Sequence, residues 1–119
     1  PNLFMITGPQ APFANLPTSI EQNAIWIADC IRKMESEGYD VFEPRQDAED
    51  EWSAHVAEVH KQTLMDVGDQ VHSWMMGANI EGHPPRILIY FGGANAYYDK
   101  LRESVNDGFP ELEFQRRAS

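Results

Sequence analysis

The stretch GPQAPFANLPTSIE, at residues 8–21, combines residue types that are well suited to contact a ligand. Phe13 and Leu16 offer apolar surface, and Asn15 offers a polar amide, directly before a helix signature. The first N–H groups of a helix are unpaired and carry partial positive charge, so this helix start suits an electron-rich oxygen or a developing anion. The alternative is a plain capped helix, with Phe13 as a hydrophobic anchor. The residues alone leave both interpretations open.

The stretch SWMMGANIEGHPPR, at residues 73–86, places an indole in a segment rich in glycine and proline. A solvated indole gains nothing from water, so Trp74 is expected to contact something. One interpretation is an amphipathic contact, in which the indole N–H donates to a ligand and the ring face excludes water. The other is a packing residue tucked under the domain. Trp74 is therefore a second candidate binding residue.

The other residue types with catalytic or metal-binding chemistry form no recognisable site. Of the four histidines, no two have i,i+4 spacing and none is near the single cysteine, which argues against zinc. His55 and His60 are predicted to be solvated helix positions, and Cys30 is predicted to be a buried structural thiol. The acidic run DAEDE marks a helix start, not a pair of catalytic carboxylates. GxSxG and GxGxxG are absent as well, so no self-contained active site is predicted.

Composition limits the classes of partner. The chain has 119 residues, enough for one domain, and a net charge of −10. This charge argues against nucleic acid or an anionic membrane as the main partner, because both bind clustered Lys and Arg. A single cysteine, with no signal peptide and no long apolar run, favours the cytoplasm. A strand-like run directly behind Pro1 is expected of a truncated chain.

The first third of the chain predicts a strand, a loop and a helix. Leu3–Thr7 is a short apolar run ended by Gly-Pro, typical of a buried strand, and 10–17 is a predicted loop. Thr18 and Glu21 form a capping box, so a helix is expected to begin there and to end at Gly38. One face of this helix is apolar and is predicted to pack on the core. Its residues stand at positions 20, 24, 27, 28, 31 and 34.

The remaining elements complete an α/β pattern. They are an extended piece at Val41-Phe42 stopped by Pro44, a helix over 48–65, a loop over 67–85, a strand over 86–91, a helix over 95–106 and a strand over 111–115. A loop as long as 67–85 is usually either functional or disordered. The order of the elements predicts the α/β class.

Three motifs follow one another along the chain. They are GPxxPFxNLPxSIE, the SWxxGAN loop, and a strand that runs into Gly92-Gly93. In this order they resemble the C-terminal part of the Baeyer–Villiger monooxygenases, the class B flavoproteins typified by cyclohexanone and phenylacetone monooxygenase. The resemblance extends from Asn2 to about Phe114. It implies an α/β segment that forms the C-terminal part of an FAD-binding dinucleotide-fold domain and is incomplete on its own.

The resemblance also implies an activity and its cofactors. The family uses FAD and NADPH to reduce O2 and to insert one oxygen atom next to a ketone carbonyl, giving an ester or a lactone, and some members oxidise sulfides. The implied partners are a small ketone, O2 and the remainder of a monooxygenase chain. The family pattern divides this chain into a flavin-bordering strand–loop–helix (1–38), a helical segment (39–66), an NADP-contacting lid loop (67–86) and a terminal strand–helix–strand (87–119).

Site residues carry over from the family position by position. Phe13, Asn15 and Leu16 match the loop that borders the flavin ring and the substrate pocket, with Ala14 between them. Trp74 matches the loop tryptophan that reaches NADP, and the resemblance gives its loop a lid role that shields the flavin from water. No catalytic residue and no metal ligand of the family falls in this segment.

The chain departs from the family at two places. His83-Pro84 stands where a Lys-Pro turn is common, and Tyr97-Tyr98 stands where a Tyr-Arg pair is usual. Both cofactor-binding GxGxxG motifs and the catalytic arginine lie upstream in relatives, so the isolated chain is expected to be inactive and poorly stable. The alternative is a non-enzymatic stand-alone protein, either a gene remnant or an interaction module that retains this fold.

Overall fold

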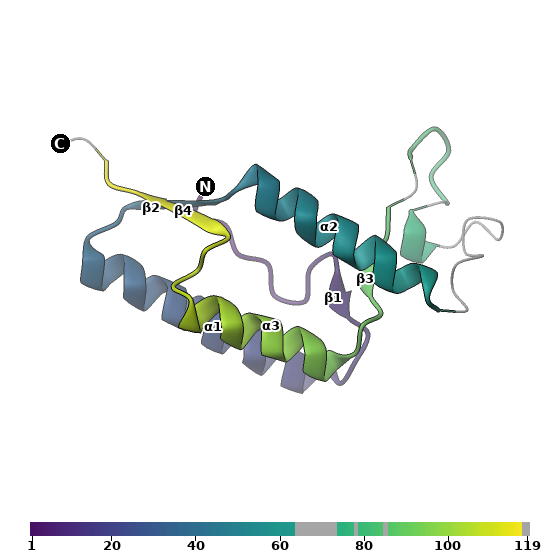
Figure 1. The fold of residues 1–119 in the computed structure, drawn as a ribbon, viewed down its shortest axis with the longest axis horizontal. Helices are drawn as coiled ribbons and strands as arrows, with labels where there is room; N and C mark the ends of the chain where they lie inside the picture. Colours follow the sequence, from purple (N-terminus) through teal and green to yellow (C-terminus); the bar gives the residue numbers. More distant parts are fainter. Residues whose placement is uncertain (64–73, 78, 85, 118–119) are drawn as a thin grey trace.

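A computed structural model describes residues 1–63, 74–77, 79–84 and 86–117 (Figure 1). Its elements are β1 (Ala11–Pro12), α1 (Leu16–Glu37), β2 (Val41–Pro44), α2 (Gln46–Lys61), the 3₁₀ helix η2 (Trp74–Met76), β3 (Ile89–Tyr90), α3 (Ala94–Asn106) and β4 (Leu112–Gln115). The predicted mixed α/β class is confirmed. The parts of the predicted 48–65 helix and 67–85 loop that fall at 64–73, 78 and 85 lie outside the described residues.

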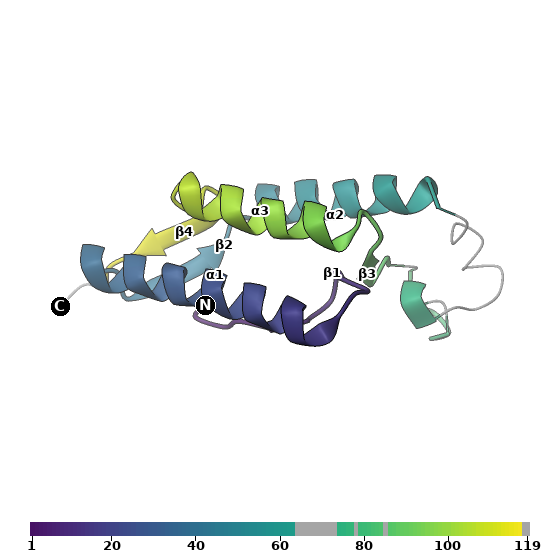
Figure 2. The same cartoon turned by 90° about the horizontal axis from the view of Figure 1, so that it is seen from below.

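Helices α1 and α3 lie side by side and run in the same direction (Figures 1 and 2), while α2 runs along the opposite edge in the view of Figure 1. Two small sheets connect them. β1 pairs with β3 in parallel, and β2 pairs with β4 in antiparallel. The two sheets stand apart along the molecule, which measures 52 × 30 × 21 Å (Figure 1). The candidate binding residues therefore lie toward the end that holds β1 and β3.

Helix α1 begins earlier than its capping box predicted. The N-cap is Asn15, whose side-chain oxygen accepts a hydrogen bond from the Thr18 N–H at 3.5 Å. Asn is a stronger N-cap than Thr, and Pro17 is tolerated in the first turn because an N–H is not needed there. The predicted end is confirmed: Gly38 adopts φ 70°, a left-handed conformation that glycine takes without a steric cost, and its N–H bonds to the Met34 carbonyl.

The predicted core face of α1 is wrong. Ile20 and Ile31 are 44% and 43% exposed, whereas Ser19, Asn23 and Cys30 are buried. The reason is the neighbour that this chain provides. Helix α3 presents hydroxyl groups, and polar side chains of α1 pair with them: Ser19 with Tyr98 at 2.8 Å, Asn23 with Tyr97 at 3.4 Å and Trp26 with Ser104 at 2.9 Å. The apolar stripe of α1 faces away from this contact.

The predicted strand Leu3–Thr7 does not form. Leu3 and Met5 are 75% and 65% exposed, and the segment adopts no strand in the structure. A strand needs a neighbour to pair its backbone groups, and none of the described residues forms one beside this segment. The predicted strand at 86–91 is likewise reduced to β3. It pairs with β1, so the predicted 10–17 loop contains a strand that the sequence analysis missed.

The second sheet agrees with the sequence-based expectation. The extended piece at 41–42 and the terminal strand at 111–115 pair as β2 and β4, with Phe42 opposite Phe114. Phe4 stacks on Phe42 at a centroid distance of 4.5 Å, and Trp26 meets Phe109 edge-on at 5.4 Å. Phe42 and Phe109 are 4% and 3% exposed, so these rings form the core at this end of the molecule. Helix α3 starts within one residue of its predicted position.

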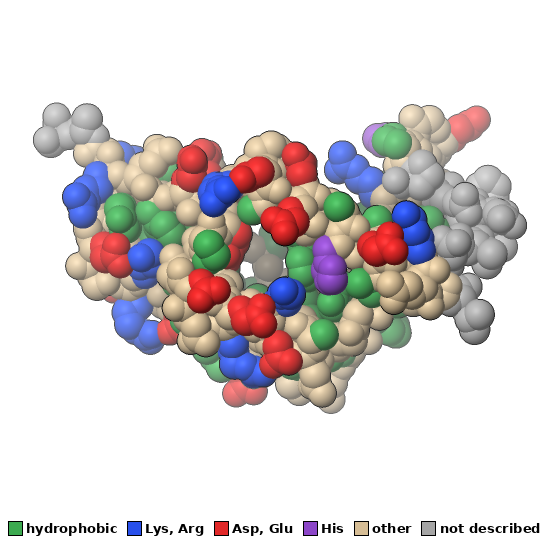
Figure 3. Space-filling view, in the orientation of Figure 1, with side chains coloured by type: hydrophobic (Ala, Val, Ile, Leu, Met, Phe, Trp, Pro, Cys, Tyr) green, Lys and Arg blue, Asp and Glu red, His purple; other side chains and the backbone are tan. Residues whose placement is uncertain are grey.

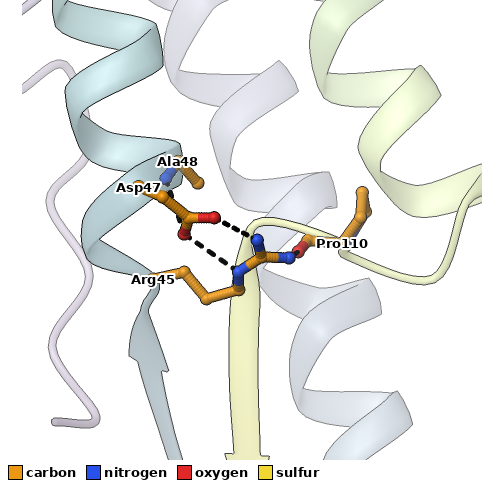
Figure 4. A network of polar contacts seen from close by, with 4 residues as sticks. All are labelled: Arg45, Asp47, Ala48 and Pro110. Carbon is orange, nitrogen blue, oxygen red and sulfur yellow. Dashed lines mark hydrogen bonds and ion pairs between the residues drawn. The ribbon is translucent and has the colours of Figure 1, made fainter.

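Arg45 joins the start of α2 to the connection between α3 and β4 (Figure 4). Its guanidinium pairs with the Asp47 carboxylate and donates to the Pro110 carbonyl at 3.0 Å, and its N–H donates to the Glu111 carbonyl at 2.8 Å. Asp47 also accepts the Ala48 N–H at 3.0 Å. The hydrogen bond from Arg45 lowers the pKa of Asp47, so the carboxylate stays ionised at the helix start, where the dipole favours it.

The Ser19–Tyr98 hydrogen bond predicts a measurable loss of stability. Both residues are buried, at 1% and 8% exposure, and their hydroxyl oxygens lie 2.8 Å apart. Tyr98→Phe leaves the Ser19 hydroxyl buried without this partner, which should cost about 1–3 kcal/mol in the free energy of unfolding, measured by urea denaturation. The matched double variant Ser19→Ala/Tyr98→Phe should recover most of that loss. Equal stability of Tyr98→Phe and wild type would show that the hydrogen bond contributes nothing.

Cys30 is fully buried, as predicted, and should be unreactive in the folded chain. Burial raises the pKa of its thiol from 9.0 to about 11, and the charge of Glu111 adds to the shift. The thiolate is the reactive form, so iodoacetamide should label Cys30 about a hundredfold more slowly at pH 8 than in urea. Above pH 9 the unfolded chain loses this proton first, so stability should fall as pH rises toward 11. Equal labelling rates with and without urea would contradict the burial.

Candidate functional site

The loop between β1 and α1 presents apolar surface beside a helix start. Phe13 and Leu16 are 79% and 58% exposed. We call residues 13–15 the Phe13 loop. β1 ends at Pro12, directly before this loop, and α1 begins directly after it, so two regular elements fix both of its ends. The side-chain oxygen of Asn15 is used by the helix cap, so the helix is capped, but the exposed Phe13 is not the hydrophobic anchor of the capped-helix interpretation.

The first turn of α1 leaves one free backbone donor. Pro17 has no N–H, Thr18 donates to the Asn15 side chain, and Ser19 donates to the Asn15 carbonyl at 3.1 Å. The Leu16 N–H donates to no partner among the described residues. It lies at the positive end of the helix dipole, three residues after the exposed Phe13 and on the exposed Leu16 itself. A ligand with a flat apolar face and an acceptor oxygen at its edge would match these features.

Trp74 lies on a short helical turn and remains accessible. It exposes 57% of its surface, whereas Met76, two residues on, is buried at 8%. Met76 therefore fills the packing role considered for Trp74. We call residues 74–77 the Trp74 turn. Gly77 closes this turn at φ 65°, and its N–H donates to the Trp74 carbonyl at 3.0 Å. A substituted residue would be strained at that φ, so glycine is required to hold this shape.

The structure connects the two candidate segments through the chain that leads into β3. The Gln10 N–H donates to the Leu88 carbonyl at 2.7 Å, and the Leu88 N–H donates to the Met75 carbonyl at 2.8 Å. The Arg86 N–H donates to the Met76 carbonyl at 2.7 Å. Sequence analysis did not predict this connection, because hydrogen bonds between distant backbone groups leave no residue pattern.

An aromatic cluster between α2, β3 and α3 was also missed. Trp52 stacks on Tyr90 at a centroid distance of 5.2 Å, and Tyr97 lies 5.9 Å from Tyr90. The His55 ring nitrogen lies 3.3 Å from the Tyr90 hydroxyl. Beside the cluster is a groove of about 590 Å³ lined by both helices, visible as a central hollow with acidic side chains around it (Figure 3). The spacing of Trp52 and His55 on one helix face was the available signal.

Two of the histidine predictions have different outcomes. His55 is exposed, as predicted. His60 is 3% exposed and packs against Phe91 at a centroid distance of 5.4 Å, so its prediction as a solvated position is wrong. Neither of its ring nitrogens has a hydrogen-bond partner within the described residues. No three His, Cys, Asp or Glu residues gather as a metal site in the part of the chain that the structure describes. None of the described helices combines the length and apolar character needed to cross a bilayer.

Comparison with known proteins shows that the chain is similar to segments of several monooxygenases. No family model matches it. It is 44% identical over 103 residues to phenazine N-monooxygenase PhzNO1 of Lysobacter antibioticus, covering 87% of this chain and 18% of that protein. It is 39% identical over 118 residues to a Baeyer–Villiger monooxygenase of Pseudooceanicola batsensis, covering 99% of this chain and 21% of that protein. Its fold matches NADP+-bound cyclohexanone monooxygenase of Rhodococcus sp. Phi1 with a TM-score of 0.83 and 34% identity, covering 96% of this chain and 21% of that one.

These matches agree in the class of protein, since each relative is a monooxygenase. The fold and the sequence together define a segment of a flavoprotein monooxygenase. More narrowly, the chain is similar to a segment of the Baeyer–Villiger monooxygenases, and it spans about a fifth of the length of the relatives it matches. The resemblance predicted from three motifs is confirmed. The four site residues carried over from the family remain predictions, since no ligand defines their contacts.

Proposed function

We propose that this chain is the C-terminal segment of a Baeyer–Villiger monooxygenase that converts a ketone, O2, NADPH and a proton into an ester or lactone, water and NADP+. The activity belongs to the complete enzyme, because this segment contains no motif for the ADP half of either cofactor. The observation that carries the proposal is the Leu16 N–H. It is a free donor at a helix start, close in sequence to the exposed Phe13, and this combination suits a flat ring with an acceptor oxygen at its edge.

The Phe13 loop and the adjoining Leu16 fit a bound FAD. The exposed side chains of Phe13 and Leu16 would lie against the flat ring and the substrate, and the Leu16 N–H would donate to an oxygen of the ring. A donor at the positive end of a helix stabilises the electron-rich reduced flavin. When bound, FAD supplies the oxygen chemistry. Asn15 contributes by fixing the start of α1, which aims the Leu16 N–H.

Trp74 fits a bound NADP. Its indole is 57% exposed on a turn closed by Gly77, so the ring can pack on the cofactor while its N–H donates a hydrogen bond. Such a contact would retain NADP beside the flavin and keep water from the reaction. We assign the NADP contact to this turn and the flavin contact to the region at 1–38.

The exposed apolar surface supports a larger parent domain. Leu3, Met5, Ile20 and Ile31 are each more than two-fifths exposed, on the N-terminal segment and on the stripe of α1. A stable monomer rarely exposes contiguous apolar surface of this kind. We infer that the remainder of an FAD-binding domain covers both surfaces, and that Leu3–Thr7 becomes a strand when it gains a neighbour. The buried free thiol is compatible with the cytoplasm as the compartment.

A second oxidation has support from one comparison. The relative named as a phenazine N-monooxygenase is 44% identical to this chain, which is a higher identity than the 39% of the Baeyer–Villiger relative. N-oxygenation of an aromatic heterocycle uses the same cofactors but a nucleophilic nitrogen in place of a ketone. Sulfide oxidation is a related possibility within the same chemistry. A non-enzymatic stand-alone module would require the exposed stripe of α1 to meet a separate partner protein.

The proposed function can be tested by purifying the complete polypeptide that carries this segment and measuring its flavin content and its NADPH consumption. We expect bound FAD and NADPH oxidation that a cyclic ketone accelerates, with a lactone as product. Acceleration by phenazine with N-oxide as the product would favour the second oxidation. An intact polypeptide of 13.6 kDa without flavin would favour the stand-alone module and overturn the enzymatic proposal.

A further inference from the structure

One backbone segment carries both candidate cofactor contacts. Residues 86–90, of which only Ile89 and Tyr90 form β3 and which we call the shared strand, receive hydrogen bonds from the β1 side and donate hydrogen bonds to the Trp74 turn. At Leu88 the two meet, because its carbonyl accepts from Gln10 and its N–H donates to Met75. Both main-chain groups of this one residue are therefore used, one for each candidate segment.

On the flavin side, the hydrogen bonds lead directly to the Phe13 loop. The Gln10 N–H donates to the Leu88 carbonyl at 2.7 Å, and Ala11 and Pro12 then pair in register with Ile89 and Tyr90. The Phe13 loop starts at the next residue. A shift of the shared strand along its axis would therefore displace this loop.

On the NADP side, two hydrogen bonds lead to the Trp74 turn. The Leu88 N–H reaches the Met75 carbonyl at 2.8 Å, and the Arg86 N–H reaches the Met76 carbonyl at 2.7 Å. Met75 follows Trp74 directly in the chain. Holding the indole in place thus holds the carbonyls to which the shared strand is bonded.

The shared strand is itself held in place by packing. Ile89 and Tyr90 are 7% and 4% exposed, and Tyr90 stacks on Trp52 of α2 at 5.2 Å. The Tyr90 hydroxyl also contacts His55 at 3.3 Å. A strand anchored in this way transmits a local change along its hydrogen bonds rather than absorbing it by side-chain rearrangement.

We propose that Leu88 is a positioning residue that couples NADP binding at Trp74 to the order of the Phe13 loop at the flavin. The inference rests on the proposed function, since it needs NADP at Trp74. By linkage the coupling is reciprocal, so order at the flavin side also strengthens NADP binding. Leu88 touches neither cofactor, and its side chain is not required for the effect. The coupling requires the backbone N–H and the backbone carbonyl of Leu88.

Amide hydrogen exchange of the complete flavoprotein, with and without NADP+, tests the coupling. The Leu88 and Gln10 amides are the donors of the two hydrogen bonds, so their exchange reports each link separately. NADP+ should slow both by about tenfold, a coupling of ordinary size. In Leu88→Pro, which removes the N–H that reaches Met75, NADP+ should no longer slow exchange at Gln10.

Two variants serve as matched controls. Ile87→Pro places the same ring one residue earlier, where the N–H donates no hydrogen bond within the described residues, and should keep the effect at Gln10. Leu88→Val changes the side chain, keeps the N–H and should behave as wild type. If Leu88→Pro fails to retain flavin, the wild-type measurement can still overturn the coupling, because coupling requires slower exchange at both amides.

The outcomes separate the two proposals. If NADP+ slows exchange at the Leu88 amide of the wild type but not at the Gln10 amide, the proposed NADP contact at Trp74 is supported and the coupling is overturned. No change at either amide would overturn the NADP contact and the coupling with it. Slower exchange at Gln10 that persists in Leu88→Pro would show that the signal does not pass through Leu88.

Discussion

Trp74→Ala in the complete monooxygenase is expected to weaken NADP+ binding and to separate NADPH consumption from product formation. The indole is 57% exposed in this segment and is free to contact a cofactor. Loss of an aromatic anchor of this kind typically costs about 2 kcal/mol, or roughly thirtyfold in Kd. With NADP held less tightly, more of the reduced oxygen should leave as hydrogen peroxide instead of entering the product.

A titration of NADP+ followed through the flavin absorption measures the first effect, and peroxide released per NADPH measures the second. Trp74→Phe keeps the ring face and loses the N–H, so it should fall between wild type and Trp74→Ala. Ile80→Ala is a suitable control, because Ile80 lies beyond the Trp74 turn and is similarly exposed, at 53%. Unchanged NADP+ affinity and coupling in Trp74→Ala would remove Trp74 from the cofactor site.

Ile20→Asp combined with Ile31→Asp is expected to have opposite effects in the isolated segment and in the complete enzyme. Both side chains are more than two-fifths exposed here, so each replacement should change the stability of the isolated segment by about 0.5 kcal/mol at most, and the segment should become more soluble. In the complete enzyme the same positions are proposed to be covered. Two carboxylates buried without partners cost several kcal/mol, enough to prevent assembly of the flavin-bound protein.

Soluble yield and bound flavin, measured for both forms, decide this prediction. Ile25→Asp is the matched control, since Ile25 is 51% exposed on α1 but lies off the apolar stripe. A complete enzyme that keeps its flavin with both aspartates would show that the stripe of α1 stays in water. The exposed surface would then need another partner, as in the stand-alone alternative.

The reliable predictions from sequence rested on local chemistry. Gly38 ends α1 because the left-handed conformation there suits glycine, and the β2 and β4 segments followed from short extended runs beside turn residues. The start of α1 was misplaced because Asn15 and Thr18 are both good caps, and the choice between them depends on Pro17 and the preceding strand.

The failures came from contacts that the sequence does not encode locally. The face of α1 and the segment Leu3–Thr7 are apolar, as predicted, but burial also requires a neighbouring element. Helix α3 presents hydroxyl groups to α1, so polar residues of α1 are buried against it, and most of Leu3–Thr7 remains exposed. His60 was misjudged because its burial comes from packing against Phe91. The Phe13 loop and Trp74 were proposed from residue types and from family motifs, whereas the backbone link at Leu88 could be found only from the structure.

The most direct test of the account is the fate of isotopically labelled oxygen. The complete enzyme, supplied with NADPH, a cyclic ketone and ¹⁸O₂, should form a lactone that carries one ¹⁸O atom, while the second leaves as water. This result would establish the Baeyer–Villiger reaction for the protein to which this segment belongs. Recovery of unlabelled ketone, with all of the consumed oxygen released as peroxide, would contradict it.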